Sequence, residues 1–199
     1  MIDPILTVGL YGKLPGRGDF IRQGWDEATI EALDHWLAEG LAAWRPDADD
    51  VFAARFAAVP LFVFYLPPGW IAATALHGVM SPSVDRAGRY FFLVAGITGS
   101  AADAWHLAVA DSGFADAVEA ATYAALGPDS DPDTLVAAVT AALPTNSGAM
   151  SWRAGLATPA DAVFWALGEG DPHIMRGARA DAAFLADLLN VNQLLGDDE

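Results

Sequence analysis

Half of the basic side chains in this sequence fall in two short segments that contain glycine and proline. Each segment also carries one carboxylate, Asp19 in the first and Asp85 in the second. Arginine pairs bidentately with carboxylates, so the two segments could brace each other. Unpaired guanidinium groups could instead form a pocket or surface for an anionic group, and a braced loop can also present such a surface. The five basic residues are Lys13, Arg17, Arg22, Arg86 and Arg89.

The residue patterns of common catalytic sites are not found. Gly12-Lys13 resembles the end of a phosphate-binding P-loop, but Leu14 stands where serine or threonine is required. There is no cysteine, no Gly-x-Ser-x-Gly elbow and no metal-ligand spacing among the four histidines. Asp19 and Asp85 could act as paired carboxylates in hydrolysis, although the arginines between them favour charge pairing. We therefore expect no catalytic residues, metal or cofactor.

Trp25 lies between the first basic segment and the next predicted helix, flanked by Gly24 and Asp26. An exposed aromatic beside arginines is typical of protein interfaces. The alternative is that Trp25 packs against the helix that follows it.

The overall charge excludes several classes of partner. Acidic residues number 26 against ten basic ones, giving a net charge of −16. Such a chain repels phosphate backbones and anionic lipid surfaces, so neither nucleic acid nor a membrane is expected as a partner. The N-terminus lacks a secretory signal, and the most apolar run is far shorter than the roughly 20 residues that span a bilayer. We expect a cytoplasmic protein.

Short apolar runs predict a sheet whose strands lead into and out of the basic segments. The expected strands are 5–11, 61–66, 70–79, 90–97 and a late strand at 161–167. The run at 61–66 has no polar face, which indicates a strand covered on both sides. Residues 12–19 and 81–88 are expected to be loops, and so is the acidic stretch 47–50.

Helical periodicity separates these strands. Residues 27–44 place apolar side chains on one face, with Asp26 as the N-cap. That face is Ile30, Leu33, Leu37, Leu41 and Trp44. Alanine-rich helices are expected at 101–110, 113–126 and 132–143, with a short one at 182–189. Strands and helices in this order predict an α/β protein with helices covering a central sheet.

Three motifs in this sequence resemble those of the TagF family of type VI secretion-associated proteins. They are GKLPGRGDFIR at 12–22, LDHWL at 33–37 and GVMSPSVDRAGRYF at 78–91, which includes Ser83. The resemblance implies a three-layer α/β/α sandwich, and the strand order suggests a mixed, partly antiparallel central sheet. One TagF-like domain would span residues 1–199, with its motif-bearing core at 5–100 and an alanine-rich C-terminal part at 101–195.

The resemblance also implies a function. Members of the family are accessory proteins of the bacterial type VI secretion machine and act as post-translational repressors. The implied partner is the forkhead-associated scaffold protein of that machine. The residues themselves leave open a second interpretation, a small-anion or nucleotide-binding module or enzyme that uses Lys13, Arg17 and Arg86.

Overall fold

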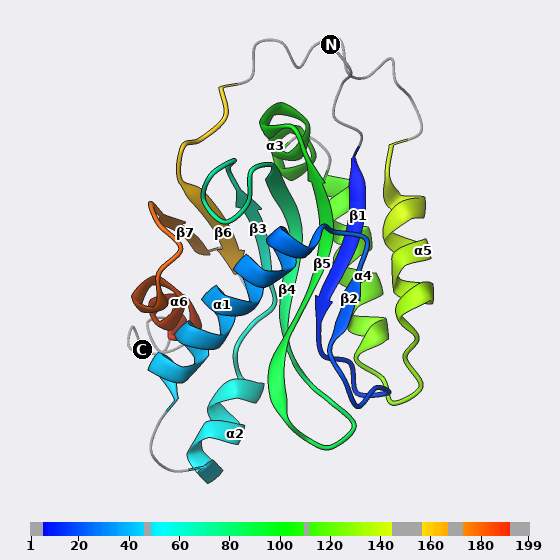
Figure 1. Cartoon of the computed structure of the whole chain (residues 1–199), viewed down its shortest axis with the longest axis vertical. Coiled ribbons are helices and arrows are strands. Elements are labelled where there is room, and N and C mark those ends of the chain that lie inside the picture. Colours follow the sequence, from blue (N-terminus) through cyan, green and yellow to red (C-terminus); the bar gives the residue numbers. More distant parts are fainter. Residues whose placement is uncertain (1–5, 46–48, 110–111, 145–156, 167–172, 192–199) are drawn as a thin grey trace.

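The computed structural model describes residues 6–45, 49–109, 112–144, 157–166 and 173–191. At its centre is a seven-stranded sheet in the order β2-β1-β5-β4-β3-β6-β7 (Figure 1). The strands are β1 (Thr7–Gly12), β2 (Ile21–Gln23), β3 (Phe62–Leu66), β4 (Ala75–Val84), β5 (Tyr90–Gly99), β6 (Ala162–Ala166) and β7 (His173–Gly177). The helices are α1 (Glu27–Trp44), α2 (Asp49–Ala57), α3 (Ala101–Val109), α4 (Ser112–Ala125), α5 (Pro132–Ala142) and α6 (Ala182–Leu189).

All neighbouring strands in this sheet are antiparallel. The predicted α/β class is confirmed, but the prediction of a mixed sheet is wrong. Neighbouring parallel strands need a crossover connection of a dozen or more residues. The turns that join β3 to β4 and β4 to β5 are too short for one, so these central strands can pair only in the antiparallel sense.

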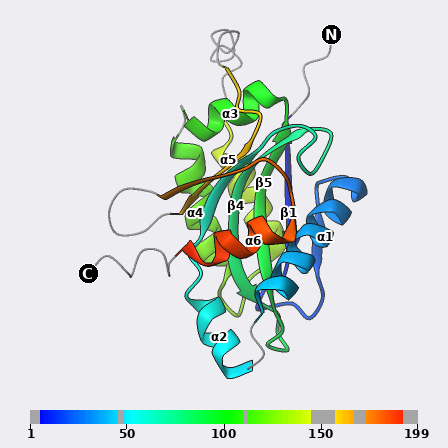
Figure 2. The same cartoon turned by 90° about the vertical axis from the view of Figure 1, so that its left-hand side faces the viewer.

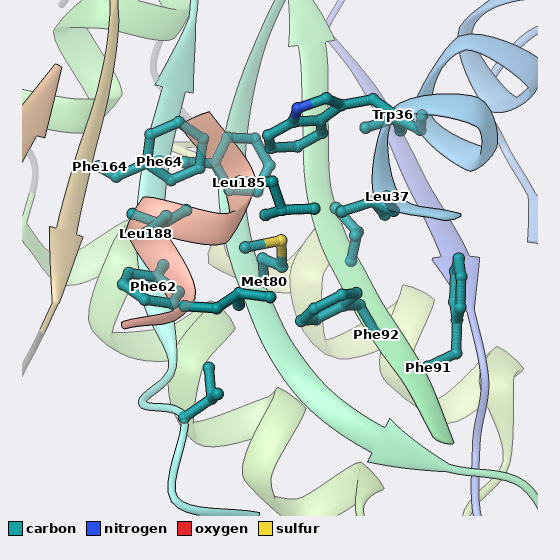
Figure 3. Packing of buried hydrophobic residues seen from close by; sticks show 14 of the residues in the cluster. Trp36, Leu37, Phe62, Phe64, Met80, Phe91, Phe92, Phe164, Leu185 and Leu188 are labelled. Carbon is teal, nitrogen blue, oxygen red and sulfur yellow. The ribbon is translucent and has the colours of Figure 1, made fainter. Parts of the chain in front are cut away.

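Helices line both faces of the sheet, and each face has its own hydrophobic cluster (Figures 1 and 2). On one face α1, α2 and α6 cover an aromatic cluster that includes Trp36, Phe64 and Phe164 (Figure 3). On the other face α3, α4 and α5 pack over smaller side chains from the same strands. Every residue of β3 is buried, which confirms the prediction of a strand covered on both sides.

Helix α1 has the predicted bounds and orientation. The Asp26 carboxylate accepts a hydrogen bond from the backbone N–H of Thr29 at 2.9 Å, as an N-cap does. Leu33 and Leu37 are fully buried in the aromatic cluster. A Cβ at Gly40 would lie 2.4 Å from the Leu185 side chain, so this glycine allows α6 to pack closely against α1.

Strand β4 differs from its prediction at both ends. It begins at Ala75 rather than at residue 70 and runs to Val84, through residues predicted to be a loop. Strand β3 pairs with β4 only as far as Met80, so beyond that point β4 has only β5 beside it. Pro82 is tolerated there because proline, which lacks an N–H, suits positions with one strand neighbour.

Three elements were not predicted. The acidic stretch 47–50 is predicted to be a loop, but α2 begins at Asp49, and residues 47 and 48 lie outside the described part of the chain. The edge strands β2 and β7 are mostly exposed or half-buried, so neither has the unbroken apolar run that identified β3. The predicted helices at 101–110 and 113–126 and the late strand correspond to α3, α4 and β6.

Candidate functional site

The two basic loops lie against each other at the end of the molecule where β4 turns into β5 (Figure 1). Nζ of Lys13 lies 3.2 Å from Oδ2 of Asp85, and Oγ of Ser83 donates to the Lys13 carbonyl at 2.8 Å. The Arg89 guanidinium donates from Nε to Asp85 and from Nη2 to the Gly18 carbonyl, both at 2.6 Å. The prediction that these loops are neighbours is confirmed. We call Lys13, Ser83, Asp85 and Arg89 the brace.

Asp85 is the centre of the brace. Its side chain is completely buried and accepts hydrogen bonds from the backbone N–H groups of Ala87 and Arg89 at 2.9 and 3.0 Å. Burial alone would raise the pKa of this carboxyl. The donors from Arg89, Lys13 and Ala87 outweigh burial and hold the pKa of Asp85 well below its usual range. Asp85 therefore stays charged and fixes the turn at 85–89.

Lys13 joins the brace to the sheet. Its backbone N–H donates to the Phe92 carbonyl at 3.0 Å, and its ammonium lies 5.0 Å from the centre of the Phe20 ring. The preceding Gly12 has a φ of 128°, and a Cβ there would lie 2.0 Å from the Phe92 carbonyl oxygen. Only glycine fits this close approach, which explains its place before the lysine.

The other predicted arginines lie outside the brace. Arg17 is half-exposed and pairs at 2.8 Å with Asp131, the N-cap of α5. Arg22, on β2, pairs with Glu27. Arg86 is exposed, and within the described residues its guanidinium has no carboxylate partner.

Two further predicted residues do not join the brace either. Asp19 is exposed and makes no ion pair with any residue that the structure describes. Trp25 is only 7% exposed and belongs to the same cluster as Ile30 of α1. A Cβ at Gly9 would lie 2.4 Å from the Trp25 ring, so the absence of a side chain at Gly9 leaves room for the tryptophan. The alternative in which Trp25 is exposed is therefore wrong, and the packed alternative is correct.

Sequence reasoning missed two partners of this region. Asp131 lies 114 residues from Arg17, so its pairing leaves no local signal, although its position before Pro132 marks it as a helix cap. Tyr11 donates its hydroxyl to Asp34 of α1. Burial and the hydrogen bond to the Asp34 carboxylate raise the pKa of Tyr11, so the tyrosine stays protonated.

At this end of the molecule, the exposed Arg86 guanidinium is able to bind an anionic group. Ser83 donates to a carbonyl and not to a general base, so it is not arranged as a nucleophile. Beside the brace, a hollow of about 360 Å³ is lined by residues 16–21 and Arg86. Among the described side chains, no group of three acids or histidines could hold a metal ion. In the part of the chain that the structure covers, no helix is long and apolar enough to cross a membrane.

Comparisons with known proteins agree with the motifs. Residues 9–142 match the family described as the TagF N-terminal domain, type VI secretion system-associated. The crystal structure of PA0076 from Pseudomonas aeruginosa PAO1 is 27% identical, with a TM-score of 0.76, and covers 92% of this chain and 93% of that one. A search of curated proteins found no significant match. Because the family match spans more than half of its length, this chain belongs to the TagF N-terminal domain family of type VI secretion system-associated proteins.

Proposed function

We propose that this protein is a cytoplasmic, non-enzymatic repressor of type VI secretion that acts after translation by binding a protein of the machine. The forkhead-associated scaffold is the partner that the family resemblance implies. The observation that carries the proposal is the brace: residues of two family motifs are used to hold two loops rigidly together. Loops on a rigid scaffold commonly carry binding residues, and these loops hold Arg17, Phe20 and Arg86 at the surface.

The surroundings of the brace favour binding over turnover. Its charges are paired with one another, and its serine has no base as a partner. A catalytic group needs a free reactive atom within reach of a substrate. The exposed groups nearby are instead an arginine and an aromatic ring, side chains that are enriched in protein interfaces.

The test uses a bacterium that secretes through a type VI machine and lacks its own copy of this gene. We expect production of the wild-type chain to lower effector release without lowering the amount of machine components in the cell. Arg86→Ala, at an exposed position, should keep the melting temperature and weaken repression. Unchanged effector release with the wild-type chain would refute the repressor role.

A second candidate function rests on the hollow beside Arg86. Arg86 and glycine-rich backbone in its lining suit a small anion, while Arg17 is paired with Asp131 and the Asp19 carboxylate also lines the hollow. Thermal shifts with phosphate, ATP and GTP test this reading, because a ligand at 100 times its Kd stabilises a protein by about 2.7 kcal/mol. A shift that Arg86→Ala abolishes would favour the anion-binding module, and no shift with these ligands would exclude them.

A further inference from the structure

An apolar groove opens next to the brace, between α2, the outer half of β4 and the end of α4. Its volume is about 400 Å³, near the lower end of the roughly 300–1,000 Å³ typical of ligand pockets. Apolar atoms form most of its walls. We call it the α2–α4 groove, and the residues that line it are Pro15, Phe56, Ala57, Val59, Pro60, Leu61, Ser81, Pro82, Ser83, Val84, Tyr90, Tyr123 and Leu126.

Exposed apolar side chains gather around this groove. Tyr123 is 52% exposed on the wall formed by α4, and Tyr90 is 36% exposed on the β5 side. Phe20 and Val51 are also exposed at this end of the molecule, but neither lines the groove. Single exposed apolar residues need no explanation, but a cluster beside a hollow marks an interaction site.

The positive charge of the chain gathers at the same end. Arg86 and Arg89 lie on the turn next to Tyr90, whereas Arg17, two residues after Pro15 of the groove, is already paired with Asp131. The Arg89 side chain is 62% exposed although it pairs with Asp85. In a chain of net charge −16, this turn is a local excess of positive charge. At physiological salt, interactions between exposed charges are screened beyond about 8 Å, so distant acidic residues do not cancel the positive potential of this turn.

From these observations we infer that the α2–α4 groove docks an acidic protein segment with an apolar anchor. The anchor side chains fill the space between Tyr90 and Tyr123. The carboxylates of the segment lie towards Arg86 and Arg89, because the turn that follows α4 and Leu126 of the groove carries Asp129 and Asp131. This inference deepens the proposed function, since it assigns the surface and the chemistry of the segment that the repressor binds.

Photocrosslinking tests the surface first. A benzoylphenylalanine replaces Tyr123 or, as a control of similar exposure on β7, Ile174, which is 56% exposed. In a type VI-competent bacterium, we expect position 123 alone to crosslink to one protein segment, which mass spectrometry then maps. The inference requires that segment to contain apolar residues and a net negative charge. No product at position 123, a basic segment, or a crosslink to a second copy of this chain would overturn it.

Fluorescence anisotropy with a synthetic peptide of the mapped segment tests the chemistry. We expect Tyr123→Ser and Arg86→Glu each to weaken binding about tenfold or more, as residues at the centre of an interface do. Ile174→Ser, the matched control, should leave the Kd unchanged. Added salt should weaken binding by the wild-type chain more than by Arg86→Glu. All of these residues are exposed, so melting temperatures should stay constant, and equal peptide affinity for every variant would overturn the inference.

The secretion assay separates this inference from the proposed function. If the wild-type chain does not lower effector release but binds the acidic peptide through Tyr123, the repressor role fails and the groove assignment stands. If the chain represses secretion and Tyr123→Ser represses equally well, the groove assignment fails alone.

Discussion

The brace and the α2–α4 groove lie at the same end of the molecule, yet their side chains are used in opposite ways. In the brace, Asp85 is wholly buried and surrounded by donors from Lys13, Ala87 and Arg89. In the groove, Tyr123 turns more than half of its surface to solvent. Ser83 belongs to both regions, since it donates to Lys13 and also lines the groove.

This difference separates residues that hold the fold from residues that are free to bind. A saturated polar cluster has little left to offer a ligand, whereas exposed aromatic surface gains free energy when a partner covers it. The four motif residues of the brace therefore position the surface, and the exposed side chains beside them are the candidates for contact. The comparison predicts that substitutions in the brace act on stability and substitutions around the groove act on binding.

The largest effect is expected for Asp85→Ala. The substitution leaves Lys13 buried without its carboxylate and removes the acceptor of two backbone N–H groups. Breaking a buried pair in this way costs about 3–5 kcal/mol. Urea unfolding followed by tryptophan fluorescence measures the loss. Asp19→Ala, a control on the facing loop, should change the free energy of unfolding by less than about 0.5 kcal/mol. Equal effects would show that the brace is not a stabilising unit.

Leu37→Ala measures the loss of unfolding free energy at a buried apolar position, for comparison with the loss in Asp85→Ala. Leu37 is fully buried in the aromatic cluster between α1 and the sheet (Figure 3). Its truncation removes packing and leaves a cavity, at a cost of about 2–5 kcal/mol. The same unfolding assay checks the value, with Ala38→Gly on the exposed face of α1 as a control for helix propensity. A loss below about 1 kcal/mol would mean that this side of α1 does not form the core.

Acid should affect the two ends of β4 in different pH ranges. At one end, His77 is fully buried, and burial lowers its pKa from 6.5 to about 4, against a smaller opposite effect of its hydrogen bond to the Phe64 carbonyl. The unfolded chain binds this proton first, so stability falls as the pH drops from 6.5 to about 4, by about 3 kcal/mol in all. Near the other end, the lowered pKa of Asp85 means that its contribution is lost only as the pH falls below its ordinary value of 3.8.

Unfolding free energies measured between pH 7 and pH 4 test the His77 range. His77→Asn keeps a donor near the position of Nδ1 and should flatten the pH dependence there. His35→Asn, on the exposed face of α1, should keep the full slope. If the slope survives in His77→Asn, the acid sensitivity arises elsewhere.

The sequence predicted those parts of the fold and site that depend on local pattern. Helix α1 follows from its apolar spacing and from Asp26, and β3 follows from an unbroken apolar run. The contact between the two loops followed from opposite charges on two motifs. The helix and the strand depend on residues close together in the sequence. The loop contact depends on charged side chains, which pair with side chains of opposite charge.

The rest depends on contacts between distant segments. Pro82 can lie in β4 because β3 pairs with β4 no further than Met80. This register depends on β3 and cannot be predicted from the sequence of β4 alone. Trp25 is buried because Gly9 leaves room for its ring across a strand. The groove has walls from α2, β4, β5 and α4, so no single stretch of sequence carries its signal.

The smallest effect on stability is expected for Arg17→Ala, at the boundary between brace and groove. Arg17 and Asp131 are both close to half-exposed, and exposed ion pairs contribute about 0–1 kcal/mol. The backbone carbonyl of Arg17 accepts from the Arg86 N–H at 2.8 Å, and this bond survives the substitution. We therefore expect a nearly unchanged unfolding curve. Arg22→Ala, which removes an exposed pair between Arg22 of β2 and Glu27 of α1, is the control of matched chemistry.

The two arginine variants differ in what surrounds them. Arg17 is two residues after Pro15, which lines the groove, and Arg17 lines the hollow beside the brace together with Arg86. Arg22 lies on the edge strand β2. If the groove end is the binding surface, Arg17→Ala should weaken repression of effector release while Arg22→Ala represses like the wild type. Equal loss in both would extend the surface along β2. A large loss of stability in Arg17→Ala would instead show that Arg17 stabilises the fold together with the brace.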